Sequence, residues 1–233
     1  MNIHLSNVDF GSRSGPNSFA LRLAHELLDR GHVLVDANAE YDVFLGFIEP
    51  ASVPRPGSRI IQRLDGIWFK PEEFLTHNQK IKAFYDSCDH VIFQSEFDKG
   101  MAEYHWGKKT SSVIHNGIDL NTLVPEHLGR FELPRDAGRV FITSANWHRQ
   151  KRLSECLRLY RQIRERKDIL VILGNNPDAT MDLGLREHWL GNVSHEICLA
   201  LYKRADWMIH LAWLDHCPNV VIEALSQGCP VIC

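Results

Sequence analysis

The sequence predicts an α/β protein of two domains, each built on a parallel sheet with helices on both faces. Three observations support this fold class. Short apolar runs typical of strands alternate with amphipathic stretches typical of helices along the 233 residues. Several strand candidates are continuously apolar, as a sheet that is buried on both faces requires. The alternation also stops at residues 121–138, which hold two prolines and two glycines, and then starts again.

In the first half, residues 1–120, strand-like and helix-like segments follow one another closely. The predicted strands are Ile3–Val8, Val33–Val35, Asp42–Phe47, Arg59–Leu64, His90–Gln94 and Ser112–His115. The predicted helices are Phe19–Arg30, Glu73–Cys88 and Glu96–Tyr104. A Gly-rich loop at Gly11–Ser18 joins the first strand to the first helix. We expect residues 121–138 to be a linker.

The second half, residues 139–233, repeats the pattern. The predicted strands are Val140–Ser144, Ile169–Leu173, a weak one near Trp189, and Trp207–Ala212. The predicted helices are Lys151–Arg166, Ser194–Lys203 and Asn219–Ser226. Pro218 suits the start of the last helix because its missing N–H would be unpaired there, and Gly228 suits its end. The final residues, Pro230–Cys233, are expected to form a fifth strand, and the domain to be incomplete.

The composition excludes several classes. The hydrophobic share of 44%, the charged share of 24% and the net charge of −3 are typical of a soluble globular protein and give no reason to expect nucleic acid. No apolar run approaches ~20 residues, and no signal peptide begins the chain, so a cytoplasmic location is expected. Arg158, Arg161 and Arg164 share one face of a predicted helix. This face is either simply solvated or weakly attracted to anionic lipid head groups at a membrane surface.

The six cysteines have no Cys-x-x-Cys spacing, and reduced structural thiols are expected rather than disulfides or zinc ligands. His210, His216 and Cys217 lie close in sequence but read as strand and loop residues, not as metal ligands.

Two acids near the C-terminus indicate a ligand site. Asp215 lies in a loop and Glu223 lies eight positions later in the predicted helix. Between them, the exposed N–H groups of Asn219 and Val220 at the helix N-terminus form a ready anion site. This arrangement is expected of a protein that binds a diphosphate and a sugar together. The alternative is that Glu223 is a solvated helix acid and Asp215 an ordinary loop residue.

The segment PNVVIEALSQGCPVI, residues 218–232, resembles the donor-binding segment of retaining GT-B glycosyltransferases of the large family 4 type. VIHNGID at 113–119, with His115 in place of a proline, and FQSEFDK at 93–99 resemble pieces of that family's first domain. The resemblance implies two Rossmann-like domains facing a cleft, with the acceptor on the N-terminal side and the donor on the C-terminal side. It also implies that Glu223 contacts the ribose and Asp215, in place of the usual Glu, the donor sugar.

The segment SANWHRQKRL, residues 144–153, places cations just beyond a predicted strand and at a helix start, where they are stabilised if an anion binds there. The resemblance implies that Lys151 binds the donor diphosphate. The family's arginine falls on Asn146, and Arg149 is a candidate replacement for the missing charge. The alternative for both Lys151 and Arg149 is a solvated surface charge.

Two further candidates lie in the first half. Gly15, in the Gly-rich loop, would face donor phosphate or acceptor, unless the loop is a plain strand-to-helix turn. Asp65 follows the strand Arg59–Leu64, where many relatives carry a histidine. It would bind a sugar hydroxyl or the acceptor, or else hold its own turn with Gly66.

The resemblance therefore implies transfer, with retention, of a sugar from a UDP- or GDP-sugar to a glycan, lipid-linked or small-molecule acceptor. Lys151, Asp215 and Asp65 are the residues expected to act in the transfer. The chain has no Asp-x-Asp motif, so no metal or other cofactor is expected.

Two alternatives remain. One is a truncated or degenerate protein that binds nucleotide sugar without turnover. The other, an NAD-type Rossmann oxidoreductase, is supported by Asp36 about 20 residues beyond the Gly-rich loop but disfavoured by the spacing of Gly11 and Gly15.

Overall fold

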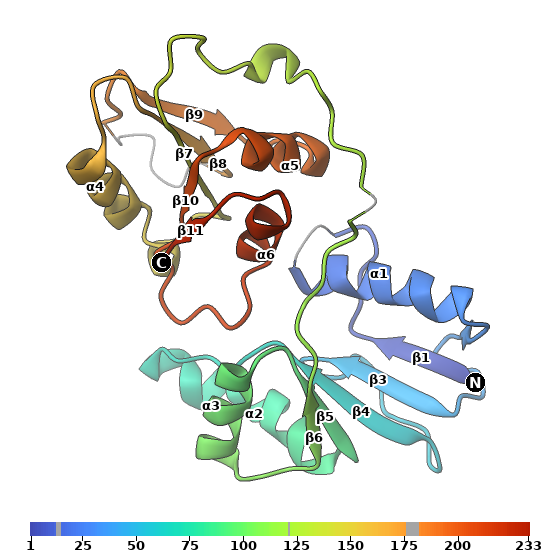
Figure 1. Ribbon diagram of the computed structural model, residues 1–233. Helices are drawn as coiled ribbons and strands as arrows, with labels where there is room; N and C mark the ends of the chain where they lie inside the picture. Colours follow the sequence, from blue (N-terminus) through green and yellow to red (C-terminus); the bar gives the residue numbers. More distant parts are fainter. Residues whose placement is uncertain (13–14, 121, 176–181) are drawn as a thin grey trace. The chain divides into compact units, whose positions relative to one another are not determined.

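The computed structural model describes residues 1–12, 15–120, 122–175 and 182–233. The chain divides into two compact units, Met1–Asn116 and Gly117–Cys233 (Figure 1). Each unit contains one sheet. The residues expected to form a linker, 121–138, fall in the second unit.

The first unit is a six-stranded sheet in the order β2-β1-β3-β4-β5-β6, with every pairing parallel. Its strands are β1 Asn2–Ser6, β2 Val33–Leu34, β3 Val43–Phe47, β4 Arg59–Leu64, β5 His90–Phe93 and β6 Ser111–Val113. Its helices are α1 Gly15–Asp29, α2 Pro71–Ser87 and α3 Glu96–Trp106. Parallel pairing places the carboxyl ends of all these strands along one edge of the sheet.

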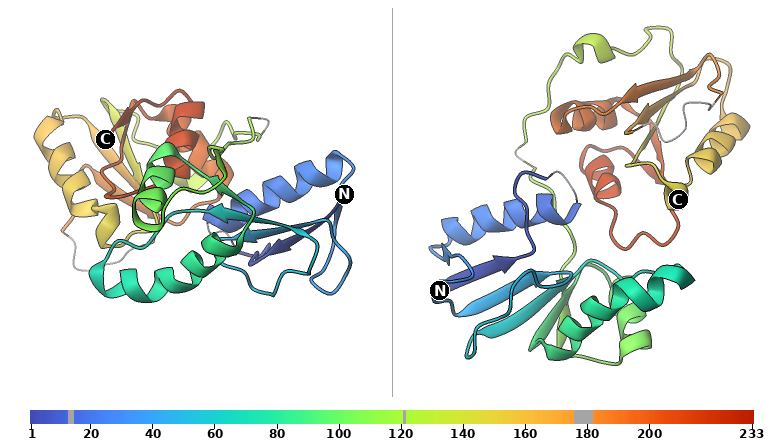
Figure 2. Two further views of the ribbon diagram at one scale, coloured as in Figure 1. Left: turned by 90° about the horizontal axis from the view of Figure 1, so that it is seen from below. Right: turned by 180° about the vertical axis from the view of Figure 1, so that it is seen from behind.

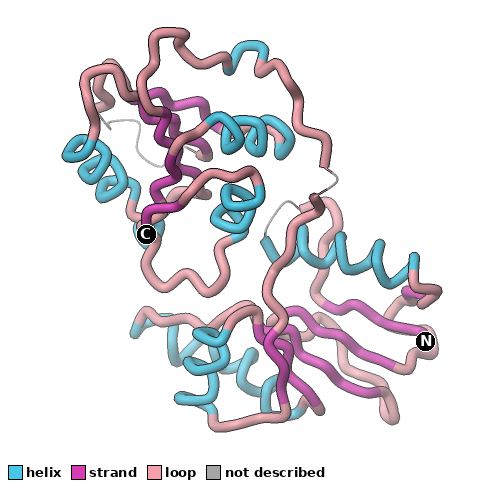
Figure 3. Tube along the Cα trace, in the orientation of Figure 1, coloured by secondary structure: helices cyan, strands magenta, loops and turns pink. Residues whose placement is uncertain are grey.

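Alternation along β3 explains how the helices cover both faces. Leu45 and Phe47 pack with Ala20 of α1 on one face. Phe44 points to the other face and packs with Phe84 of α2. Figure 3 shows the cyan helices of this unit on both sides of its magenta strands.

The second unit is a five-stranded parallel sheet in the order β11-β10-β7-β8-β9. Its strands are β7 Val140–Ser144, β8 Ile169–Leu173, β9 Glu187–Gly191, β10 Trp207–Ile209 and β11 Val231–Ile232. Its helices are α4 Leu153–Ile163, α5 His195–Arg204 and α6 Asn219–Ser226, and the 3-10 turns are η1 Gly129–Phe131 and η2 Arg149–Lys151. The turned views of Figure 2 show the same sheet between its helices.

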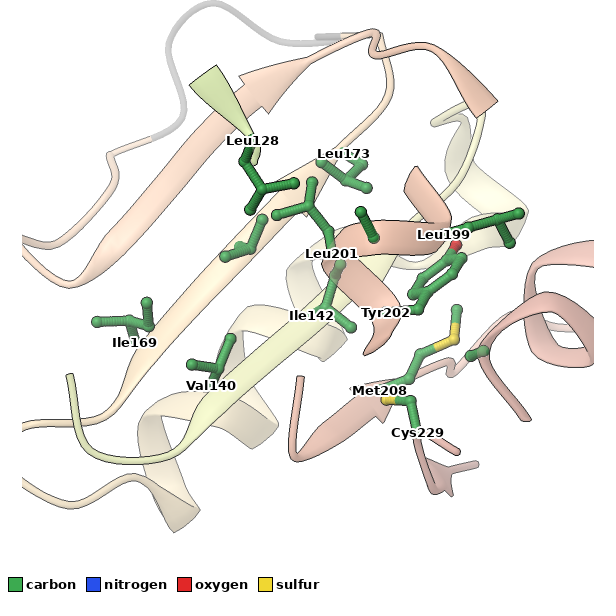
Figure 4. Close-up of a cluster of buried hydrophobic side chains, with 13 residues drawn as sticks. Leu128, Val140, Ile142, Ile169, Leu173, Leu199, Leu201, Tyr202, Met208 and Cys229 are labelled. Carbon is green, nitrogen blue, oxygen red and sulfur yellow. The ribbon is translucent and has the colours of Figure 1, made fainter. Parts of the chain in front are cut away.

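The core of this unit lies on both faces of β7 and β8, whose residues are all buried. Ile142 belongs to one cluster with Tyr202 of α5 and Ala224 of α6. Figure 4 shows Tyr202 on the same side of the sheet as Ile142. Phe141 faces α4 and packs with Tyr160. Leu128, from the stretch expected to be a linker, is 2% exposed within the first of these clusters, so this stretch packs on the core of the second unit.

The sequence-based fold class is confirmed, but some boundaries differ. Helix α1 begins at Gly15, inside the predicted loop Gly11–Ser18, of which residues 13–14 lie outside the described residues. The helix expected at Lys151–Arg166 begins only at Leu153, because Arg152 has a left-handed φ of 54° that separates it from η2. Strand β10 ends at Ile209, three residues early, and Pro218 caps α6 rather than starting it.

Within the described ranges, every helix is too short or too polar to traverse a bilayer.

Candidate functional site

The loop that follows β7 is fixed against the end of β8. The indole Nε1 of Trp147 donates to the Leu173 carbonyl at 2.8 Å, and the Trp147 backbone N–H donates to the side chain of Asn175 at 2.5 Å. Gly174 has φ +111°, and a Cβ at this position would overlap the carbonyl oxygen of Ala145. The two loops therefore touch at a point where only glycine fits.

This fixed loop leads directly into the 3-10 turn η2, which carries Lys151. The carbonyl of Gln150 in the turn accepts a 2.8 Å hydrogen bond from the N–H of Trp213, in the loop after β10. The loops after β7 and β10 are thereby held together at the carboxyl edge of the sheet.

Lys151 and Asp215 meet at this edge, although 64 positions separate them in the sequence. Nζ of Lys151 lies 2.5 Å from Oδ2 of Asp215, and the two side chains are 25% and 20% exposed. Nε2 of His210 lies 3.4 Å from the same oxygen. Burial raises the pKa of the Asp215 carboxyl, but His210 and the charge of Lys151 outweigh it and bring the pKa to about 2. Asp215 is therefore ionised at neutral pH.

Helix α6 begins four residues beyond Asp215, after Pro218. Hydrogen bonds to the Pro218 carbonyl come from Val221 and Ile222, whereas the N–H groups of Asn219 and Val220 have no acceptor among the described residues. These two N–H groups lie at the positive end of the helix dipole, which favours an anion.

Glu223 lies one turn further along α6 and is half-buried. Oε1 of Glu223 is 3.3 Å from Nε2 of His195, at the start of α5. Burial raises the pKa of the Cys198 thiol to about 12, and the charge of Glu223 adds to this effect. Since Cys198 belongs to α5, Glu223 lies on the side of α6 that faces α5. Ser144, the last residue of β7, also interacts with the Cys198 thiol.

The second unit thus brings Lys151 and Asp215 into contact and places Asn219, Val220 and Glu223 on the helix beside them. No contact among the described residues joins Glu223 to Lys151 directly. Asn146 and Arg149 are both exposed in the loop and turn before Lys151.

In the first unit, Asp65 forms an ion pair with Arg63 of β4, whose side chain is only 3% exposed. The same guanidinium donates to Oδ1 of Asn116 at 2.7 Å and lies 3.8 Å from the ring centre of Phe19. Gln94 closes this network, because its amide donates to the Asp65 carbonyl at 2.5 Å and accepts from Asn116 at 3.1 Å. The carboxylate of Asp65 is therefore engaged within the protein.

A hollow of about 410 Å³ opens at the carboxyl end of β1, within the ~300–1,000 Å³ range of small-molecule sites. Its polar lining comes from His4, Ser6, Asn7, Asp9, Asn17 and Ser52. The His4 ring is fixed by contacts of 3.0 Å to the Val35 carbonyl and 3.4 Å to the Ser52 hydroxyl. Gly15 begins α1 two residues before Asn17.

Three features of these sites were not anticipated from sequence: the approach of His210 to Asp215, that of His195 to Glu223, and the pairing of Arg63 with Asp65. The one available signal was the position of His210 within the apolar run predicted as the strand Trp207–Ala212. In helix α4, Arg161 donates to both carboxylate oxygens of Glu187, at 2.7 and 2.6 Å. Within the described residues, no three metal-ligating side chains gather closely enough to hold an ion.

Residues 129–233, nearly all of the second unit, match the family model described as Glycosyl transferases group 1. The second unit is similar to glycosyl transferases of group 1. No curated protein sequence is similar enough to match the chain. Solved structures of glycosyltransferases match the chain at low identity and show its fold.

The chain resembles sucrose-phosphate synthase from Thermosynechococcus elongatus with a TM-score of 0.77 and 14% identity, over 99% of this chain and 80% of that one. HepE from Anabaena, in complex with UDP-glucose, gives 0.72 and 15%, over 99% and 79%. An alpha-glucosyltransferase in complex with UDP and a 13-mer DNA gives 0.67 and 10%, over 99% and 79%.

Proposed function

We propose that this chain transfers a sugar from a nucleoside diphosphate sugar to an acceptor, with retention of the anomeric configuration and without a metal ion. The observation that supports this most is the pairing of Lys151 with Asp215, four residues before helix α6, whose first N–H groups, those of Asn219 and Val220, have no acceptor among the described residues. A cation, an acid and a helix N-terminus at the carboxyl edge of a parallel sheet suit a sugar diphosphate. The family match of residues 129–233 supports the same reaction class.

In this proposal, the chemistry is mainly electrostatic. Lys151 and the N–H groups of Asn219 and Val220 stabilise the charge that develops on the leaving diphosphate. Asp215 accepts hydrogen bonds from sugar hydroxyls, a role that suits a carboxylate with a pKa of about 2 and excludes it as a proton donor at neutral pH. Glu223 binds the ribose. The absence of a metal from the proposal rests on the sequence, which lacks an Asp-x-Asp motif.

For the donor, a UDP-sugar or a GDP-sugar is proposed, because HepE and the alpha-glucosyltransferase were solved with UDP or UDP-glucose. For the acceptor, the hollow at the end of β1 is proposed, because hydroxyl, amide and carboxylate groups line it. Asp65 would then act by fixing Arg63 rather than by touching the acceptor.

Binding of nucleotide sugar without turnover is the second candidate. It is favoured by the neutral, exposed Asn146 at the family's arginine position and by the neutralisation of Lys151 by Asp215. Both leave less positive charge for the leaving group than the family pattern would supply.

Thermal-shift screening of the chain against UDP-, GDP- and ADP-sugars identifies the donor, because a ligand that binds the native state raises the melting temperature. Sugar transfer and donor hydrolysis are then measured for the wild type, Lys151→Ala and Glu223→Ala. Loss of one transition-state contact at Lys151 is expected to lower kcat by roughly 100-fold. Loss of the hydrogen bonds to Glu223 is expected to raise the donor KM by roughly 10-fold or more.

Lys203→Ala and Glu165→Ala, which remove exposed charges elsewhere in the same unit, serve as matched controls and are expected to leave both activities unchanged. Wild-type rates in Lys151→Ala and Glu223→Ala would overturn the site. Donor binding without transfer or hydrolysis would establish the second candidate instead.

A further inference from the structure

His210 stands immediately after β10, buried to 9% exposure, and its backbone N–H donates to the Ile232 carbonyl at 2.8 Å. Its ring therefore has little freedom to move away from the carboxyl edge of the sheet. Nε2 of the ring is buried and has no hydrogen-bond partner among the described residues. This nitrogen lies 3.4 Å from Oδ2 of Asp215.

That separation is slightly longer than the ~2.7–3.2 Å of a good N–H···O bond. The same Oδ2 is already engaged by Nζ of Lys151 at 2.5 Å. Asp215 thus has one close partner and, behind it, a second donor within a few tenths of an ångström of hydrogen-bond distance.

Binding of the nucleotide sugar would change the hydrogen-bond partners of Asp215. If Lys151 turns to a diphosphate, the carboxylate loses its close partner while it stays mostly buried. Leaving a buried acceptor unpaired is unfavourable, and more so when the acceptor is charged. This penalty would weaken the affinity for the nucleotide sugar unless another hydrogen-bond donor replaced the lysine.

We propose that His210 is a positioning residue that takes over the Asp215 carboxylate when Lys151 turns to the donor diphosphate. The inference rests on the proposed function of Lys151 as a diphosphate ligand. In the tautomer that carries its proton on Nε2, His210 donates to Oδ2 and keeps Asp215 in place for the sugar. The histidine touches neither the sugar nor the phosphate and acts only through Asp215.

The test compares His210→Leu, which removes the donor, with His210→Gln, which keeps a donor amide. The probe is whichever of UDP, GDP or ADP most raises the melting temperature of the wild type. Titration calorimetry measures its affinity, and transfer assays measure the donor KM and kcat. His210→Leu is expected to weaken affinity and raise the donor KM by roughly 10-fold, and His210→Gln by less than about 3-fold.

The melting temperature without ligand separates this role from a structural one. It should fall only slightly in His210→Leu, because Lys151, the closer partner of Asp215, still pairs with it in that state. In the Lys151→Met background, His210→Leu should not weaken nucleotide binding further, because no lysine leaves the acid.

Wild-type affinity in His210→Leu would overturn the role of His210 while leaving the proposed function intact. So would a His210→Leu variant that is destabilised without ligand and whose binding defect persists in His210→Gln. If the wild type binds none of the three nucleotides, the proposed function itself fails, and the role of His210 fails with it.

Discussion

Replacing Asp65 with alanine should destabilise the first unit rather than remove a chemical group from the reaction. Arg63 is almost fully buried, and Asp65 is its partner in an ion pair. Removing one member of a buried pair costs about 3–5 kcal/mol, because the other charge is left uncompensated. Here the guanidinium keeps its 2.7 Å hydrogen bond to Asn116 and its place over the Phe19 ring. The lower end of that range, about 3 kcal/mol, is therefore expected.

Urea unfolding measures this free energy directly, and a loss of this size should also lower the melting temperature by roughly 10 °C. Asp86→Ala is the matched control, because its ion pair with Lys82 lies on an exposed helix surface and should be worth less than about 0.5 kcal/mol. If Asp65→Ala unfolds like the wild type but loses sugar transfer, Asp65 acts on the substrate and the structural account of it is wrong.

Three other substitutions give distinct signatures. Burial raises the pKa of Asp98 to about 7, so the folded state keeps a proton that the unfolded chain releases near pH 3.8. The free energy of unfolding should therefore fall as pH rises from about 4 to 7. Urea unfolding of Asp98→Asn should lack that slope. The pKa of Asp215 in the folded protein, about 2, lies below its unfolded value of 3.8. The stability that the ionised carboxylate contributes should therefore be present above pH 4 and lost as the pH falls toward 2. Thermal melts of Asp215→Asn should not show this loss of stability at low pH. Gly174→Ala should lower the free energy of urea unfolding by about 2–3 kcal/mol, because Gly174 has φ +111° and a Cβ there would collide with Ala145. The control Gly191→Ala, with φ +73° and open space around it, should lower it by about 1 kcal/mol. Equal losses would contradict the close approach of the two loops.

Local patterns were sufficient to predict most of the fold. Strands β7 and β8 are unbroken apolar runs, and both are buried along their full length. Helix α6 was predicted with its observed bounds, because Pro218 and Gly228 mark its two ends. These features depend on residues that are close together in the sequence, where periodicity and end signals operate.

The departures have causes that neighbouring residues do not reveal. Lys151 lies in a 3-10 turn because Arg152 adopts a left-handed conformation, which is unusual for an arginine. In the candidate site, the sequence and the resemblance predicted Lys151 and Asp215 in one donor site but not a direct contact between them. That they pair, with His210 behind them, depends on the register of β10 beside β7 and on the hydrogen bond between Trp213 and Gln150. Contacts set by sheet order cannot be read from composition or spacing.

The most direct test of the proposed donor site is a crystal structure of this chain with the nucleoside diphosphate sugar that the thermal-shift screen selects. The account predicts the diphosphate between Nζ of Lys151 and the N–H groups of Asn219 and Val220, the ribose on Glu223, and Asp215 on the sugar. A donor bound elsewhere, with Lys151 still paired to Asp215, would contradict it.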